Sequence, residues 1–205
     1  MKQKNIVTNT IHILTSLFTW LIIWNHLNFE FGEKVISYFF TDITNHPYLL
    51  LFQSFYLLFI TSIILFLWFI IFKKFDFFYL NTKKVLLLYI IPLIIFLLSF
   101  VYTNEKTMST ILQETFSFIV LSFSQDILTF GILQTYLSKL INTYYATILT
   151  VCMFFIGHIG FFPLNILLLF YITGFVLFGY LRYKDKNIYR LNVIHTSFNL
   201  IRHFF

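Results

Sequence analysis

The sequence predicts an all-α membrane protein, a polytopic bundle of about seven transmembrane helices. Composition is the first observation, because 59% of the 205 residues are hydrophobic and only 11% are charged. A soluble domain is about a quarter charged, since its surface faces water. The second observation is a mean hydropathy of +0.84. The third is that lysines and arginines cluster between apolar runs, so we interpret the net charge of +6 as an orientation signal and expect no nucleic-acid partner.

The predicted helices follow from the apolar runs. A membrane-crossing helix needs about 20 mostly apolar residues, each rising ~1.5 Å. The segment 29–42 is too short and too charged to cross, so we expect it to lie at a membrane interface. The seven runs long enough to cross are 8–27, 47–72, 84–103, 110–138, 140–159, 164–181 and 190–205. The first run resembles a signal peptide, but no small-x-small cleavage site follows Trp24, and we expect a retained helix.

Charged residues predict the orientation of these helices. Every second loop is basic, and the positive-inside rule assigns basic loops to the cytoplasm. We therefore expect a multi-pass protein of the cell membrane with a cytoplasmic N-terminus, and heavy use of Phe, Ile and Asn suggests a bacterial source. The basic residues are Lys2, Lys4, Lys73, Lys74, Lys83, Lys84, Lys139, Arg182, Lys184, Lys186 and Arg190.

Strongly polar residues interrupt the second half of the chain. Such groups within a span cost roughly 2.5–3.5 kcal/mol on insertion scales, so each needs a reason. Gln125 and Asp126 lie in the middle of the fourth span, and His158 closes the fifth. His195 and Asn199 are four residues apart in the last span, which places both on one helix face. These groups predict one polar cavity in which histidine and carboxylate act on water.

These residues leave other interpretations open. Membrane histidines often make hydrogen bonds between helices without any catalytic role. Polar midplane residues could also line a transport path, although the chain has no inverted repeat and no pair of broken helices. Asp126, His158 and His195 could bind zinc with water in the fourth place. Convergence also requires the last helix to begin deep, because counting from the basic loops places His195 much shallower than Asp126.

Two spaced motifs carry a family resemblance. Phe154 and His158 form Phe-x-x-x-His, and His195 and Asn199 form His-x-x-x-Asn. In this order, they resemble the second and third motifs of the CPBP family of intramembrane proteases. That family is related to the type II CAAX prenyl endopeptidase and to bacteriocin-processing and self-immunity proteins. We therefore divide the single membrane domain into N-terminal helices, 1–107, and a CPBP-like core, 108–205.

The resemblance implies a mechanism and roles for these residues. In the family, the first glutamate of a Glu-Glu-x-x-x-Arg motif and the second-motif histidine activate water for attack on a peptide carbonyl. Carried over, His158 becomes the partner of the water, and His195 and Asn199 donate to the developing negative charge. The resemblance favours a site without a metal or other cofactor.

The first motif is degraded in this chain. Alignment on Gly131 places Gln125 and Asp126 at the two glutamate positions and Phe130 at the arginine position. Gln125 cannot accept a proton as a carboxylate does. Asp126 is one methylene shorter than glutamate and is rotated by about 100° around the helix axis relative to position 125. The formal charge of the motif nevertheless stays at minus one.

The sequence therefore leaves three functions open. The first is an intramembrane peptidase that uses Asp126 as its base on membrane-associated or CAAX-type peptides. The second is a non-catalytic family member that binds a membrane peptide or a lipidated or precursor protein, in self-immunity or surface-protein export. The third is a small transporter. The sequence does not fix the oligomeric state.

Overall fold

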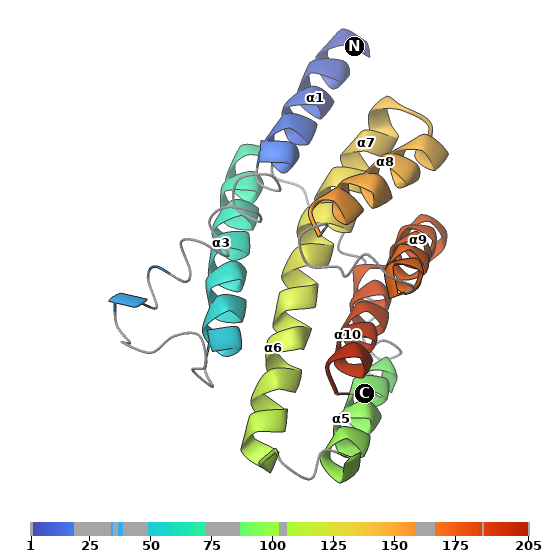
Figure 1. Ribbon diagram of the computed structural model, residues 1–205. Helices are drawn as coiled ribbons and strands as arrows, with labels where there is room; N and C mark the ends of the chain where they lie inside the picture. The colour runs from blue at the N-terminus through green and yellow to red at the C-terminus, as the bar shows by residue number, and fades with distance from the viewer. Residues whose placement is uncertain are drawn as a thin grey trace.

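The computed structural model describes most of the predicted helices. It describes residues 2–18, 34, 37–38, 49–72, 87–102, 106–158, 167–185 and 187–204. The predicted segment 29–42 and the basic loop 73–84 fall largely outside these residues. The elements are α1 (Lys2–Phe18), α3 (Leu49–Phe72), α5 (Ile90–Tyr102), α6 (Met108–Asp126), the π-helix η2 (Ile127–Leu133), α7 (Gln134–Leu140), α8 (Thr143–Ile156), α9 (Leu167–Asp185) and α10 (Ile188–Phe204) (Figure 1).

The all-α fold class is confirmed within the described residues. Because α6, η2 and α7 form one continuous helix, the elements named above make seven helical segments in the described part of the chain, and each overlaps a predicted span. Two of them, Leu50–Leu67 and Met108–Leu140, are long and apolar enough to cross a membrane by length and composition. Seven crossings therefore remain a prediction. Helix α9 continues past the predicted end at 181, since Arg182 and Lys184 are good helix formers and suit a helix C-terminus.

The described helices are apolar outside and partly polar inside. Large hydrophobic side chains on the outer faces of α3, α5, α8 and α9 are exposed, which is the pattern expected of helices in lipid. The buried residues of α6 and α10 include many that can hydrogen-bond between helices. Those residues are Thr115, Ser117, Ser122, Ser124, Gln125, Asp126, Asn192, His195, Thr196 and Ser197.

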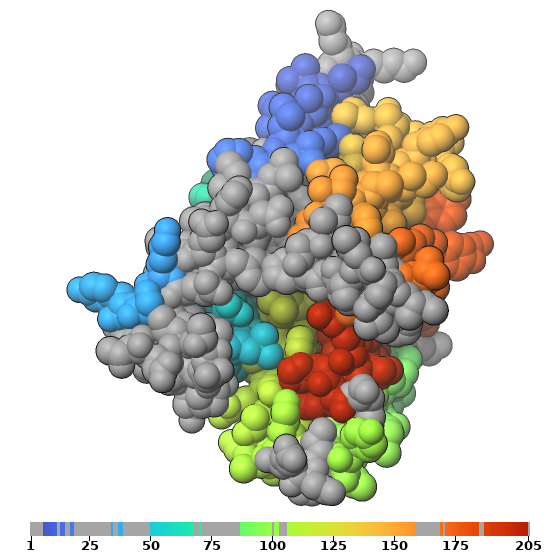
Figure 2. Space-filling model, viewed as in Figure 1, coloured from blue at the N-terminus to red at the C-terminus, as the bar shows by residue number. Residues whose placement is uncertain are grey.

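The long helix of α6, η2 and α7 is the axis of the fold. Thr107 caps it, because its side chain accepts a hydrogen bond from the backbone N–H of Thr110. Helices α3, α5 and α10 pack against α6, while α1 packs against η2 and α7. Ser54 of α3 donates to the Ser117 carbonyl at 3.0 Å, which fixes α3 beside α6. On the face seen in Figure 2, α10 reaches the surface beside the green α5 and α6.

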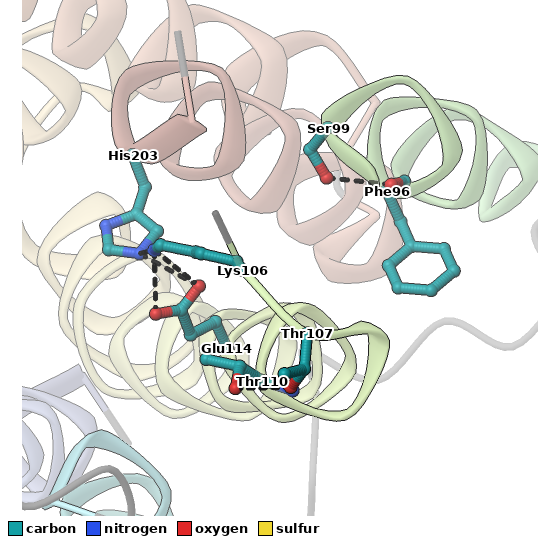
Figure 3. A network of polar contacts seen from close by, with 7 residues as sticks. All are labelled: Phe96, Ser99, Lys106, Thr107, Thr110, Glu114 and His203. Atoms are coloured by element: carbon teal, nitrogen blue, oxygen red, sulfur yellow. Dashed lines mark hydrogen bonds and ion pairs between the residues drawn. The ribbon is translucent and has the colours of Figure 1, made fainter. Parts of the chain in front are cut away.

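A charged cluster joins the start of α6 to the end of α10. Lys106 Nζ lies 2.9 Å from both carboxylate oxygens of Glu114, and His203 Nε2 lies 3.2 Å from Glu114 Oε2 (Figure 3). Lys106 also lies over the Phe204 ring, 5.2 Å from its centroid. These contacts hold the outer ends of α6 and α10 together, so the two helices run side by side towards the polar residues deeper in the bundle.

Candidate functional site

Asp126 and His195 meet in the interior, between the last residue of α6 and the second turn of α10. Asp126 Oδ1 lies 2.8 Å from His195 Nδ1, and the side chains are 0% and 3% exposed. The residue counts had placed His195 much shallower than Asp126, but the two side chains converge. When the carboxylate is ionised it only accepts hydrogen bonds, and the Nδ1 atom of His195 then carries the hydrogen of this bond.

Asn199 lies one helical turn beyond His195, as its spacing predicted. Its Nδ2 atom donates to Ser122 Oγ at 3.0 Å. Ser122 is in turn one helical turn before Asp126 on α6. Two polar contacts therefore hold α6 and α10 together at successive turns. These contacts fix the turn before Asp126 and the turn after His195.

Sequence reasoning missed the role of Asn192. This residue is completely buried and lies three positions before His195, on the same face of α10. Its amide donates to the Ile119 carbonyl at 3.4 Å and accepts from the Tyr89 hydroxyl at 2.5 Å. The role of Asn192 could have been predicted from its spacing, because it lies three residues before His195, which lies four before Asn199. Tyr89 comes from outside the predicted core, so residues before 108 support the site.

His158 lies in the turn that ends α8. Its Nδ1 atom is 2.7 Å from the Phe154 carbonyl oxygen. A carbonyl oxygen only accepts hydrogen bonds, so Nδ1 carries the hydrogen. In the neutral ring, Nε2 is then the atom with the lone pair, which is the form that a general base requires.

Both histidines border one aromatic cluster. The Phe154 ring centroid lies 4.5 Å from that of His158 and 5.7 Å from that of His195. Phe175 lies 5.4 Å from His158, and Phe178 lies 4.7 Å from His195. The phenyl rings of Phe154, Phe175 and Phe178 also contact one another. Both imidazoles therefore contact the same Phe154 ring.

The degraded first motif lies beside this cluster. Gln125 is 3% exposed, and its side chain makes no hydrogen bond with any residue that the structure describes. Phe130 is fully buried with its ring 5.2 Å from that of Phe154, so it belongs to the aromatic packing. The Phe130 carbonyl accepts from Arg182 Nε at 3.0 Å. Arg182 was interpreted from the sequence only as an orientation signal, yet it packs inside the bundle.

The arrangement bears on the zinc alternative. Asp126 and His195 touch, but no group of three His, Cys, Asp or Glu side chains suited to a metal ion occurs in the described part of the chain.

Comparison with known families fits this geometry. Residues 107–201 match the family model described as type II CAAX prenyl endopeptidase Rce1-like. This stretch is an Rce1-like domain. The Rce1-like domain covers slightly less than half of the chain and contains Gln125, Asp126, His158, His195 and Asn199. No curated protein and no solved structure gives a match.

The domain agrees with the resemblance inferred from the three motifs. The chain is accordingly a membrane protein with a domain of the CAAX-protease family. The domain begins just before α6, while α1, α3 and α5 are outside it.

Proposed function

We propose that the chain is an intramembrane peptidase of the CAAX-protease type, acting on membrane-associated or lipidated peptides. The observation that carries the proposal is the buried 2.8 Å contact between Asp126 and His195, with His158 bordering the same aromatic cluster. The Rce1-like domain supports the same reaction class.

The Asp126–His195 pair suits the stabilisation of an oxyanion. Asp126 fixes the His195 ring through Nδ1 and stabilises its protonated form, so the Nε2 hydrogen is available as a donor. The Asn199 amide, one turn away, can provide a second donor. Preorganised donors in a site that excludes water stabilise a developing negative charge strongly. In this proposal Asp126 is a positioning residue that acts through His195.

His158 provides the base in this proposal. Its Nε2 atom takes a proton from water while the water oxygen bonds to the carbonyl carbon of the peptide. The tetrahedral oxyanion is held by His195 and Asn199. When it collapses, the C–N bond breaks, and His158 gives the proton to the leaving nitrogen. Because Gln125 cannot share the proton as a carboxylate would, we expect slow turnover.

The alternative is a non-catalytic protein that binds a peptide in the same cavity. Gln125 and Phe130 favour it, since the first glutamate and the arginine of the first motif are replaced by groups that do not ionise. Bacteriocin self-immunity or export of surface proteins would suit such a protein.

Cleavage of a fluorogenic farnesylated peptide by the full chain in detergent separates the two proposals. We expect slow cleavage by the natural sequence and its loss in His158→Ala and His195→Ala. Gln125→Glu should raise kcat by about 10²- to 10⁴-fold, the usual contribution of a positioned base. His203→Ala, which removes a histidine at the far end of α10 and leaves the ion pair of Lys106 with Glu114 in place, is the matched control and should cleave normally.

Two outcomes would reject the peptidase. If only Gln125→Glu cleaves, the natural chain is a binding protein. If His158→Ala cleaves as well as the natural sequence, the assigned base is wrong.

A further inference from the structure

A cationic pocket lies where α7, α8 and α9 come together. Its volume is about 240 Å³, and its lining includes Arg182, Lys139, Thr135, Ser138 and Thr143. All five can donate hydrogen bonds, and the described residues that line the pocket include no acidic side chain. Thr143 is also the first residue of α8, so the positive end of that helix dipole faces the same region. The pocket is therefore suited to an anion.

Arg182 provides the second, independent observation. It is only 6% exposed, and it forms no ion pair with a carboxylate among the described residues. Its Nε atom donates to the Phe130 carbonyl and its Nη2 atom to Thr135 Oγ1, each at 3.0 Å. The Nη1 atom has no hydrogen-bond partner among those residues. A buried cation is costly unless it is paired, and the guanidinium group suits phosphate, so a bound phosphate oxygen would satisfy both needs.

Gln134 adds an acceptor to the same pocket. Its Nε2 atom donates to Thr147 Oγ1 at 2.8 Å, while its buried Oε1 atom has no partner among the described residues. An unsatisfied acceptor and an unsatisfied donor on residues that line one pocket fit a ligand that carries both anionic oxygens and a hydroxyl group. A glycerophosphate head group has this combination.

An apolar groove of about 590 Å³ continues from the pocket along α8 and α9, with Tyr183 lining both. Its other side chains include Ile148, Val151, Phe155, Ile172 and Val176. Ile172 and Tyr183 are eleven residues apart on α9, so the groove is about 17 Å long, which suits an extended hydrocarbon chain. Val176 is exposed on the outer face, so the groove opens towards lipid.

The position of the pocket also fits a head group. Lys139 and Lys184 belong to the basic loops predicted to face the cytoplasm, where anionic lipid head groups lie. Lys184 Nζ lies 5.9 Å from the centre of the Tyr180 ring. Together with Tyr144 and Tyr183, this tyrosine is typical of the aromatic residues at a membrane interface.

We propose that α7, α8 and α9 bind an anionic glycerophospholipid, with its phosphate on Arg182 and Lys139 and one acyl chain in the α8–α9 groove. The site is separate from Asp126, His158 and His195. Arg182 connects the two sites, because its Nε atom also donates to the carbonyl of Phe130. Phe130 is part of η2, which begins directly after Asp126. A bound lipid would therefore stabilise the π-helix that supports the peptidase candidate site.

Native mass spectrometry of the full chain in detergent tests this proposal without any activity measurement. The probes are dioleoyl phosphatidylglycerol, dioleoyl phosphatidylcholine, and inorganic phosphate added to either lipid. We expect one phosphatidylglycerol per chain, bound about 10- to 100-fold more tightly than phosphatidylcholine, as charge-assisted hydrogen bonds of this kind provide.

Three variants locate the site. Lys139→Gln removes an exposed cation, and Val176→Trp fills the groove without touching Arg182; each should weaken phosphatidylglycerol binding about tenfold or more. The control variant Val101→Trp carries the same substitution at an exposed residue of α5, and it should bind phosphatidylglycerol normally. Equal binding of the two lipids, or normal binding by Val176→Trp, would overturn the proposal. Displacement of the lipid by an equal concentration of inorganic phosphate would make the occupant a free anion instead.

Discussion

Asp126 occupies a position where burial opposes charge. Removing a carboxylate from water costs several kcal/mol, and one hydrogen bond to an imidazole offsets only part of that cost. The Oδ2 atom of Asp126 has no hydrogen-bond partner among the described residues. A buried pair that served only to stabilise the fold could be replaced as a whole by apolar residues at little cost. The presence of Asp126 beside His195 therefore favours a chemical role.

Asp126→Asn tests that role at the residue itself. The amide oxygen can still accept from Nδ1, but it cannot stabilise a protonated His195. We expect kcat to fall by about 10²- to 10⁴-fold with little change in KM. Steady-state kinetics with the fluorogenic peptide measures both values.

Combination with His195→Ala provides the check. If the two residues act as a unit, the double variant loses no more activity than His195→Ala alone. Additive losses would mean that Asp126 and His195 act independently.

Variants of Ser122 and Asn199 distinguish an effect on stability from an effect on peptide cleavage. Loss of either partner should lower the free energy of unfolding by about 0.5–1.5 kcal/mol, because one buried hydrogen bond is broken. Only Asn199→Ala should also abolish cleavage, since Ser122 acts solely on the orientation of the amide. Equilibrium unfolding and peptide cleavage are measured on both variants. An equal loss of activity in Ser122→Ala would remove Asn199 from the proposed oxyanion site.

At the scale of helices, η2 changes the direction of the side chains after Asp126. The Gln134 N–H bonds to the Thr129 carbonyl, five residues back, so the helix is wider here by one residue. All seven residues of η2 are buried. The widening leaves the Phe130 carbonyl available to Arg182 of α9. This contact links the candidate site to one of the two helices that line the groove.

Gly179 sets how closely α8 and α9 approach. A Cβ atom there would lie 2.4 Å from Val151 Cγ2 and 3.1 Å from Thr147 Cγ2. Valine is stiff about χ1, so it cannot move aside easily. We expect Gly179→Ala to lower the free energy of unfolding by about 1–3 kcal/mol, although alanine is the better helix former.

The double variant Gly179→Ala/Val151→Ala is the matched test, because the smaller side chain at 151 makes room for the new methyl group. It should recover part of the stability measured by unfolding in detergent. A double variant less stable than both single variants would show that the α8–α9 contact does not depend on this packing.

At the scale of the whole molecule, the length of the helix from Met108 to Leu140 predicts that its two ends lie on opposite sides of the membrane. Its 33 residues extend for about 50 Å, well beyond a hydrocarbon core of about 30 Å. With Cys152 changed to serine, Ser109→Cys and Lys139→Cys should react with a membrane-impermeant maleimide from opposite sides. The positive-inside rule places Lys139 in the cytoplasm. Labelling of both from one side would contradict the crossing.

The sequence predicted the helices and most of the candidate site for simple reasons. Long apolar runs leave few alternatives to helices, and Asp126, His195 and Asn199 stand out because polar groups are costly there. Arg182 was misinterpreted, since basic residues near a span end usually lie in loops. The π-helix and the contact of Tyr89 with Asn192 depend on packing between distant segments. Contacts between distant segments cannot be predicted from a local pattern in one sequence.

The hydrogen bond from Tyr89 to Asn192 has a consequence for where this protein can be cut. The Rce1-like match begins at residue 107, but the hydroxyl group that satisfies the buried Asn192 amide comes from residue 89. Helix α5 also packs directly on α10. A graft of residues 107–201 into another host would thus transfer the reactive groups without the support that aligns them. The segment that matches the family model is therefore shorter than the segment that the candidate site needs for its support.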